Sequence, residues 1–453
     1  MLLLFLITML DLLVLSVTSI TAWFNVFPSP KPKLEPLEFF PWEQSTVFEL
    51  PEFKRDRLSQ SIADNYLQKL DQEGFDRDRQ GIWVQSGWDV SASNLGKTPL
   101  PAASLTKIAT TLVTLHKWGA NHQFTTDIYF TGEINHGVVT GDLIIQGTGD
   151  PLFVWEEAIA LGNALNQLGI KEIQGNILVT DKFYMNFESQ SLAAGRLLQQ
   201  ALDRNLWRAE ITQQYQQMPA GTKQPQVIIT GQIKQIQQLP VKAQLLISHH
   251  SLPLAEILRQ MNIYSNNQMA QILADLVGGA DVVAQSSAKI AGFPEAEIKL
   301  VNGSGLGEEN KISPRAVCQM LMTSDRLLQS NNYSVADLFP TAGRDLVGTV
   351  KDRDLPQGTT IKTGTLDNVS ALAGVIPTSN KSKGIAAQGD NVYFSMINYG
   401  RPVQYFRQQQ DNLLNELVKP WQLVPNNFNL AQENNWYLGN PQRNKLNTIE
   451  TIN

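Results

Sequence analysis

The 453-residue sequence has few residues of the kinds that build metal centres and disulfide frameworks. Its single cysteine, Cys318, lies in the apolar stretch AVCQML, which predicts a core residue. One cysteine forms no intrachain disulfide and no thiolate cluster, and the five histidines show no ligand-like spacing. We therefore expect neither a metal nor another cofactor.

Strongly basic segments are also missing. The chain has 36 Lys and Arg against 42 Asp and Glu, which gives a formal net charge of −6 at pH 7. Without a basic run or a basic–aromatic patch, a nucleic-acid partner is not expected. Hydrophobic residues make up 42% of the sequence, and the length predicts two or three domains with a sizeable core.

The apolar segment 1–27 has Asp11 as its one charged residue, and no Lys or Arg precedes Lys31. Its length suits a secretory signal or a membrane anchor, although the basic start and the usual cleavage site are absent. Both interpretations stay open, as do a buried helix and a translation start upstream of the true one. We expect an exported protein of the periplasm or cell envelope. The proline-rich residues 28–44 predict a linker.

Hydrophobic periodicity separates helical from strand-rich parts of the chain. The region 125–245 is predicted to be a β-rich insertion with one helix, and the Asn- and Gln-rich tail 424–453 to be flexible. The two strands 359–364 and 369–376 are separated by a short turn and predict a hairpin. The other predicted elements are helices at 55–73, 104–118, 153–168, 265–277 and 314–328, and strands at 81–86 and 392–398.

One helix begins with an unfavourable charge. In PAASLTKIATTLVTLHKWG, Lys107 occupies the first turn, where the helix dipole disfavours a cation, and Ser104 lies three residues earlier. Residues three apart share a helix face. A serine hydroxyl becomes a nucleophile when a base removes its proton, and a lysine with a lowered pKa can be that base. The pair predicts a nucleophile and its base, with the Ser104 amide as an oxyanion donor.

Two further motifs supply the groups that such a pair needs. Ser265-Asn266-Asn267 precedes an apolar helical pattern, so that Ser265 can relay a proton and Asn267 can bind a substrate amide. Lys362-Thr363-Gly364 is predicted to end a strand, followed by Thr365 as the second oxyanion amide. Gly364 lets a substrate backbone approach closely. Ser-x-x-Lys, Ser-x-Asn and Lys-Thr-Gly in this order form the signature of penicillin-recognising serine enzymes.

A rival set exists in the same order. Ser286 and Lys289 form a second Ser-x-x-Lys, and Ser330-Asn331-Asn332 forms a second Ser-x-Asn. The first lies in the middle of VVAQSSAKIAG, where no helix start exposes the serine, and the second lies in a polar segment without apolar support. A catalytic constellation needs rigid support, so we favour the set that begins at Ser104.

The chain resembles the D-alanyl-D-alanine carboxypeptidase/endopeptidase family of low-molecular-mass penicillin-binding proteins, the type with a large insertion between the first two motifs. The resemblance covers most of residues 48–400. It implies an α+β penicillin-binding-protein/β-lactamase-like transpeptidase fold, an antiparallel sheet flanked by helices, with an inserted β-rich accessory region. It rests on PAASLTK, QGTGDPLF, GNILVTD, LPLAEILRQMNIYSNNQMAQ, NGSGLGEENKISP, FPTAGRDLVGTV and IKTGTLDNVSALAGV.

The resemblance also implies roles for single residues. Ser104 would attack the carbonyl between two terminal D-alanines of a peptidoglycan stem peptide, with Lys107 as base and Ser265 as proton donor to the departing D-alanine. The substrate would be held by Asn267, Lys362, Thr363, Gly364 and Thr365, with Lys362, Thr363 and Thr365 receiving its terminal carboxylate. β-Lactams would acylate Ser104. The implied domains are a catalytic one at 45–124 and 246–423 and an inserted one at 125–245.

The chain departs from the family pattern at Asn302, where the family usually has aspartate, and at Gln271, where glutamate is common. Neither position carries a catalytic role. Two alternatives stay open: a non-catalytic binding protein on the same fold, and a β-lactamase or esterase, which would need an additional base for fast deacylation. NGSG and GTGDPLF, which contain Ser304 and Asp150, are interpreted as turns rather than as sites.

Overall fold

The computed structural model describes residues 56–87, 89–378, 391–421, 423 and 437–447. The predicted leader at 1–27 and the predicted linker at 28–44 lie outside these residues. No helix within the described ranges is long and apolar enough to cross a membrane.

A five-stranded antiparallel sheet organises the part of the chain that carries the motifs. The predicted hairpin is confirmed, and its first strand forms one edge of this sheet. Strands from the two ends of the described chain meet in the middle, where Trp83 pairs with Ser395. The order is β15 (Thr360–Leu366), β16 (Val369–Ile376), β17 (Val392–Tyr399), β1 (Gln80–Ser86) and β2 (Asp89–Asn94).

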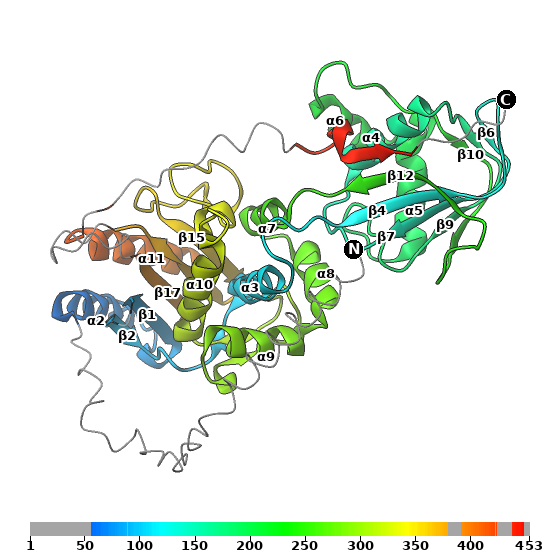
Figure 1. Cartoon of the computed structure of the whole chain (residues 1–453). Coiled ribbons are helices and arrows are strands. Elements are labelled where there is room, and N and C mark those ends of the chain that lie inside the picture. The colour runs from blue at the N-terminus through cyan, green and yellow to red at the C-terminus, as the bar shows by residue number, and fades with distance from the viewer. Residues whose placement is uncertain (1–55, 88, 379–390, 422, 424–436, 448–453) are drawn as a thin grey trace, which may run out of the picture. The chain divides into compact units, whose positions relative to one another are not determined.

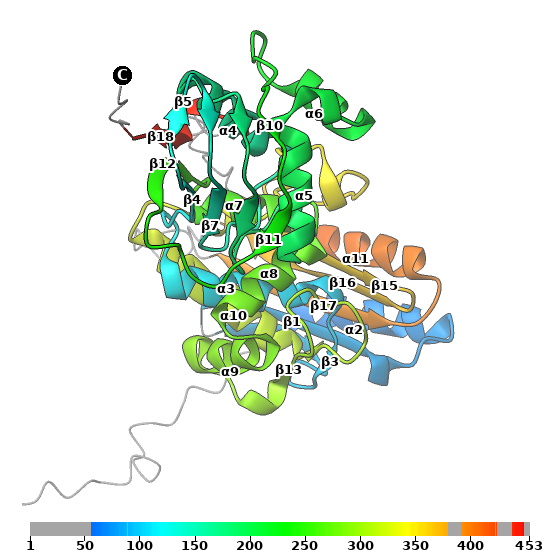
Figure 2. The same ribbon diagram turned by 90° about the vertical axis from the view of Figure 1, so that its right-hand side faces the viewer.

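Helices cover both faces of this sheet (Figures 1 and 2). On one face α2 (Arg57–Gln72) packs beside α11 (Val403–Val418), and Leu67, Phe394 and Phe406 are fully buried between them and the strands. The other face carries a helical layer that holds the first two sequence motifs. It contains α3 (Thr106–Trp118), α7 (Leu254–Ile263), α8 (Asn267–Val277), α9 (Ala280–Ala291) and α10 (Pro314–Gln329).

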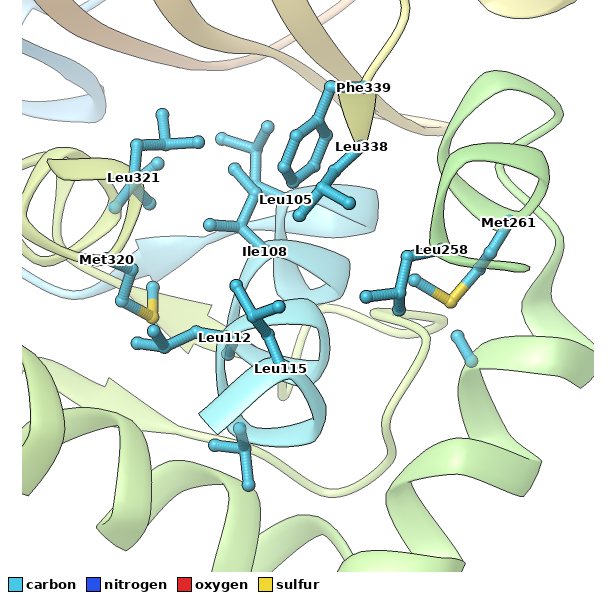
Figure 3. Packing of buried hydrophobic residues seen from close by; sticks show 14 of the residues in the cluster. Leu105, Ile108, Leu112, Leu115, Leu258, Met261, Met320, Leu321, Leu338 and Phe339 are labelled. Carbon is cyan, nitrogen blue, oxygen red and sulfur yellow. The ribbon is translucent and has the colours of Figure 1, made fainter. Parts of the chain in front are cut away.

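Helix α3 is the centre of that layer. Its apolar residues at three-and-four spacing, from Leu105 to Leu115, contact side chains of α7 and α10 (Figure 3). Leu112 is fully buried among them. Apolar burial contributes about 25 cal/mol per Å², so this stripe anchors the start of α3 firmly. Cys318 is buried in the same core, as its apolar sequence context predicts.

A second hydrophobic core is built from residues between 128 and 247. Its six-stranded sheet is mixed, because β7, β9 and β11 run parallel while β4 and β12 run antiparallel to their neighbours. The order is β11 (Ile233–Gln235), β9 (Ile177–Val179), β7 (Leu143–Gly147), β4 (Thr125–Phe130), β12 (Gln244–His250) and β18 (Asn444–Leu446). A smaller sheet has the order β10 (Ile228–Ile229), β8 (Glu172–Ile173), β6 (Val138–Val139) and β5 (Ile134–Asn135).

This region contains more helix than the sequence pattern predicts. The expected helix is present as α4 (Trp155–Gln167). Two others, α5 (Ser191–Leu202) and α6 (Ala209–Gln217), were not predicted. In α5 the buried residues Ala194, Leu198 and Leu202 follow helical spacing, and small residues such as Gly195 let the helix lie close to β9 and β11.

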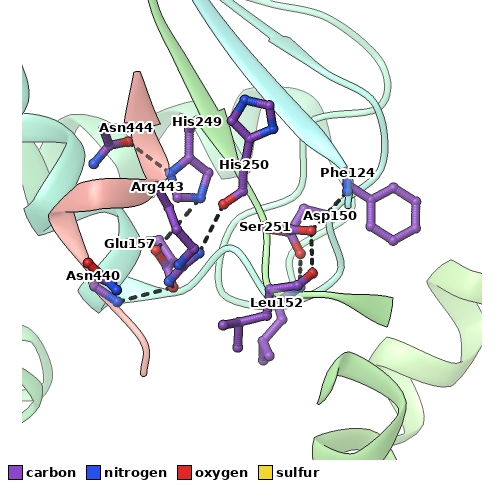
Figure 4. Close-up of polar contacts among 12 residues, drawn as sticks. Phe124, Asp150, Leu152, Glu157, His249, His250, Ser251, Asn440, Arg443 and Asn444 are labelled. Atoms are coloured by element: carbon purple, nitrogen blue, oxygen red, sulfur yellow. Dashed lines mark hydrogen bonds and ion pairs between the residues drawn. The ribbon is translucent and has the colours of Figure 1, made fainter. Parts of the chain in front are cut away.

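The expectation of a flexible tail at 424–453 is wrong for residues 437–447. Strand β18 pairs antiparallel with β12, at the edge of the sheet. Arg443, just before it, forms an ion pair with the buried Glu157 of α4 and donates a hydrogen bond to the carbonyl of His250 (Figure 4). The polar composition suggested disorder, but here polar side chains satisfy buried partners. The remaining tail residues lie outside the described chain.

Candidate active site

Ser104 lies at the start of α3, in a 3-10 turn that covers Ala103–Leu105. Amide N–H groups in the first turn of a helix have no intrahelical acceptor and can serve an external anion. Ala103, directly before the serine, has a positive φ of 47°, a backbone conformation that costs a non-glycine residue about 1–3 kcal/mol. Close packing maintains it, since a side chain at Gly305 would collide with the Ala103 carbonyl.

Lys107 is fully buried and its Nζ meets three oxygen atoms. Nζ lies 3.0 Å from Ser104 Oγ, 2.7 Å from Asn267 Oδ1 and 2.8 Å from the Ser304 carbonyl oxygen. An ammonium can donate to all three. A neutral amine can donate to the amide and carbonyl oxygens and accept the proton of Ser104. The geometry therefore serves both protonation states of a base.

Burial lowers the pKa of Lys107 from its ordinary value of 10.5 to about 7. Removal from water disfavours the charged form, and no carboxylate among its hydrogen-bond partners opposes that effect. Near neutral pH a substantial share of this amine is therefore unprotonated. The position of Lys107 at the start of a helix predicts a lowered pKa from the helix dipole, whereas in the structure the cause is burial.

A loop at 301–310 supplies the Ser304 carbonyl. Asn302 Oδ1 accepts hydrogen bonds from Ser304 N, Ser304 Oγ and Gly305 N, at 3.1, 2.9 and 2.8 Å. Gln271 Oε1 accepts one from Gly303 N at 3.0 Å. At both departures from the family pattern an amide oxygen thus accepts bonds that a carboxylate can also accept. The Ser304 hydroxyl is bonded within the turn, in keeping with a structural role.

The second motif lies between α7 and α8. Asn266 is the N-cap of α8, and its side chain accepts a hydrogen bond from Met269 N at 3.0 Å. Ser265 precedes the cap with a positive φ of 52°, which turns its side chain out of the helical path. Asn267 begins the helix, and its side chain reaches Lys107 while remaining exposed. The motif opens a helix, as the sequence predicts.

The third motif lies on the edge strand β15. The strand continues to Leu366, so Lys362-Thr363-Gly364 occupies its middle rather than its predicted end. Lys362 Nζ lies 2.9 Å from Ser265 Oγ and 2.7 Å from the Thr363 carbonyl. A Cβ atom at Gly364 would lie 3.0 Å from Ser104 N, which explains why a side chain is absent where β15 passes Ser104. Thr365 is exposed one residue further.

Lys362 is as buried as Lys107. Burial, and after it the charge of Lys107, holds the pKa of Lys362 well below its ordinary value. Two lysines that each contact a serine hydroxyl thus disfavour each other's charged state. A pair of this kind can pass a proton from one serine to another without accumulating two buried charges.

The rival set is not arranged for chemistry. Ser286 lies inside α9, Lys289 of the same helix is exposed, and Ser330 is an exposed residue at the end of α10. Lys362, which the rival set would also need, contacts Ser265 of the other set.

The predicted site residues are brought together through these hydrogen bonds and the close approach of Gly364 to Ser104. Two contacts were not anticipated: the backbone carbonyl of Ser304 on Lys107, and a 2.8 Å hydrogen bond from Arg407 of α11 to Thr365 Oγ1. Every residue type has a backbone carbonyl, so the sequence gives no sign of the contact with Lys107. Arg407 lies 42 residues from its partner in an ordinary amphipathic helix, so no sequence signal marks it.

Comparison with known proteins shows the family to which the chain belongs. A model of the D-Ala-D-Ala carboxypeptidase 3 (S13) family matches residues 65–197 and 193–417. The chain belongs to this family. The D-alanyl-D-alanine carboxypeptidase DacB of Haemophilus influenzae is 24% identical, across 72% of this chain and 87% of that protein. Carboxypeptidase DacB of Mycolicibacterium smegmatis is 30% identical over 28% of this chain and 31% of that protein.

Solved structures share the fold. A predatory endopeptidase of Bdellovibrio bacteriovorus matches with a TM-score of 0.65 at 20% identity, covering 77% of this chain and 94% of that one. Penicillin-binding protein 4 of Haemophilus influenzae matches with a TM-score of 0.58 at 20% identity, covering 78% and 99%. The predicted α+β penicillin-binding-protein-like fold is confirmed, as is the family of serine-type DD-peptidases.

Proposed function

We propose that Ser104 is the nucleophile with which this chain hydrolyses the bond between two terminal D-alanines of peptidoglycan stem peptides, and related D-alanyl cross-links. The observation that carries the proposal is the placement of Lys107 Nζ 3.0 Å from Ser104 Oγ, in a buried setting that favours the neutral amine. A base must lie within hydrogen-bond reach of the proton it removes, with a pKa near the working pH.

In the first step Lys107 takes the Ser104 proton while Oγ bonds to the scissile carbonyl carbon. The amides of Ser104 and Thr365 would receive the developing oxyanion. The carbon–nitrogen bond then breaks, and the departing D-alanine takes a proton from Ser265, which contacts Lys362. The proton that Lys107 removed from Ser104 replaces it on Ser265, so that Lys107 is neutral again for the second step. Asn267 orients the substrate amide and Lys107, while Thr363 and Gly364 line the strand that receives the peptide. Water hydrolyses the resulting ester and frees Ser104.

β-Lactams should acylate the same serine, because their strained amide presents the same carbonyl to Ser104. A solved structure of the Bdellovibrio endopeptidase is acylated by penicillin G, and one of Haemophilus penicillin-binding protein 4 is complexed with a β-lactam. For the chain as a whole we propose export to the periplasm or cell envelope, with residues 1–27 as signal or anchor. The proposed domains are catalytic at 45–124 and 246–423 and accessory at 125–245.

The test is intact-protein mass spectrometry after brief incubation with a penicillin, with peptide mapping of the adduct. One penicilloyl group on the peptide that carries Ser104 is expected, and Ser104→Ala should abolish both the adduct and D-alanine release. Ser286→Ala, in the rival motif, is the matched control and should change neither. Binding without an adduct would favour the non-catalytic alternative, and rapid turnover of penicillin would favour a β-lactamase. Either result would overturn the proposal.

A further inference from the structure

Two chain segments next to Ser265 carry large apolar side chains that are exposed. These side chains, with their accessible fractions, are Tyr264 (57%), Leu346 (76%) and Val347 (48%). The two segments are in contact, because a Cβ atom at Gly348 would lie 2.3 Å from the Ile263 carbonyl oxygen. Single exposed apolar residues are common on proteins, but three of them in neighbouring segments beside a site serine indicate a surface that a ligand covers.

The loop that carries Leu346 and Val347 is held firmly. Arg259 of α7 forms an ion pair with Asp345 at 2.5 Å, and the Asp345 carboxylate also accepts a hydrogen bond from Thr341 N at 2.7 Å. The side chains of both ions are largely buried. Because the residue directly before the two apolar ones is fixed in this way, their side chains have a defined place beside α7.

Strand β15 gives the order of groups along the site. Gly364 of this strand passes Ser104 N, and Lys362, two residues earlier, contacts Ser265. Residues two apart on a strand lie on the same face and are separated by about 7 Å. In the proposed reaction the scissile carbonyl lies beside Ser104, and the amine that departs lies toward Ser265. The leaving side of a bound peptide is therefore the side of Lys362.

The exposed apolar residues lie further in that direction. Thr360, two residues before Lys362, pairs with Thr341, and their hydroxyl oxygens are 3.1 Å apart. Five residues after Thr341 the same segment reaches the two exposed side chains of the loop. The part of a peptide beyond its scissile bond is thus the part that can contact this surface.

We propose that Tyr264, Leu346 and Val347 form an apolar subsite for the side chain of the departing residue, which favours cross-linked stem peptides over free ones. A terminal D-alanine offers this subsite one methyl group. In a cross-link the departing amine belongs to a diamino acid, whose methylene chain leads to the second peptide. Covering that chain removes apolar surface from water. The inference rests on the proposed function and assigns the choice between the two substrates to residues outside the three motifs.

The experiment compares two peptides with the same acyl-D-alanyl group, one ending in D-alanine and the other in D-norleucine. D-Norleucine keeps the free carboxylate and adds three methylenes, which stand for the chain of a cross-link. Both peptides yield the same acyl-enzyme, so a difference in kcat/KM arises before the last residue departs. One methylene fully removed from water changes an equilibrium about fourfold. For three partly covered methylenes we expect the wild type to prefer D-norleucine roughly 10-fold.

The variant Leu346→Ser with Val347→Ser should reduce this preference to less than about threefold and leave hydrolysis of the D-alanine peptide unchanged. Hydrolysis of a cross-linked peptide dimer should fall by a similar factor. Both side chains are exposed, so the double variant should fold. The matched control replaces an exposed leucine and an exposed valine of the inserted region, Leu206→Ser with Val241→Ser, and should keep the wild-type preference.

If the double variant hydrolyses the D-alanine peptide normally and keeps the wild-type preference, or if the wild type has no preference, the inference is wrong while the proposed function stands. If the folded wild type hydrolyses neither peptide, the proposed function itself fails. A wild type that dimerises in sedimentation and a double variant that does not, with equal preferences, would assign the exposed residues to contacts between copies instead. If the double variant does not fold, Leu346→Ser alone replaces it, and an unchanged preference counts against the inference.

Discussion

The Ser304 backbone carbonyl accepts a hydrogen bond from Lys107 Nζ at 2.8 Å. This contact makes a loop nearly 200 residues away in sequence part of the setting of the base. Thr110, one turn along α3, donates to the neighbouring Gly303 carbonyl at 2.8 Å, so the loop is tied to the same helix twice. The position of the Lys107 amine therefore depends on the contacts that fix the conformation of this loop.

Asn302 holds that turn, and its replacement tests the dependence. Asn302→Leu removes the acceptor for two backbone N–H groups and the Ser304 hydroxyl, so we expect acylation by penicillin to slow by about 10- to 100-fold. Asn302→Asp retains the acceptor and should stay within about threefold of wild type. Stopped-flow acylation rates would check both. Equal losses in the two variants would show that the accepting oxygen is not what matters.

The pH dependence of acylation follows from the pKa of Lys107. As the proposed base, Lys107 would act in its neutral form, and burial lowers its pKa to about 7. The acylation rate should therefore be low at pH 5, rise as the pH passes through about 7, and level off above it. With an unperturbed lysine the rate would continue to rise until the pH reached the ordinary lysine pKa of 10.5. Rates measured from pH 5 to 10 with a neutral acylating agent distinguish the two profiles.

The α3 core should be sensitive to cavities. Leu112→Ala removes buried methyl groups from the tightly packed helical layer, and we expect the free energy of unfolding to fall by about 2–5 kcal/mol. The exposed Leu346 is the control, since its side chain is 76% accessible and its change to Ala should cost less than about 0.5 kcal/mol. Urea denaturation measures both. Similar losses of unfolding free energy in the two variants would contradict the tight packing around Leu112.

Arg443 should contribute strongly to the stability of the inserted region, although it lies near the end of the described chain. Arg443→Met leaves Glu157 buried without its cation and should cost about 3–5 kcal/mol. Burial already raises the pKa of Glu157 and Arg443 opposes that rise, so in the variant the carboxyl should take up a proton more readily. The difference in stability between Arg443→Met and the wild type should therefore become smaller as the pH falls.

Thermal unfolding between pH 5 and 8 would measure this effect. Lys445→Met, an exposed change in β18 two residues after Arg443, serves as the control. Adding Glu157→Gln to Arg443→Met should recover part of the stability, because no charge is then left unpaired. A double variant no more stable than Arg443→Met would contradict the ion-pair explanation.

Sequence patterns predicted the motif-bearing elements well because these elements obey local rules. The stripe from Leu105 to Leu115 is periodic, and the turn between β15 and β16 is short. Ser265 and Lys362 could be placed together only through the family resemblance, since their contact spans 97 residues.

What the sequence did not predict depends on tertiary context. The parallel pairing of β7 with β9 leaves no local signal, and α5 lies in a segment that resembles a loop between strands. Asn444 belongs to a stretch rich in polar residues, yet its side chain is bonded to the buried His249. The burial of polar groups depends on partners far along the chain, which composition does not reveal.

The return of β18 to the edge of β12 has a consequence for synthesis of the protein on the ribosome. Strand β4 begins at Thr125, but the sheet to which it belongs is completed only when residues 444–446 have emerged. Until then β12 presents an unpaired edge and Glu157 lacks its counter-ion. The region around β4 and β12 can therefore begin to assemble before residues 251–421 have been translated, and its sheet is completed only by a strand that is made after them.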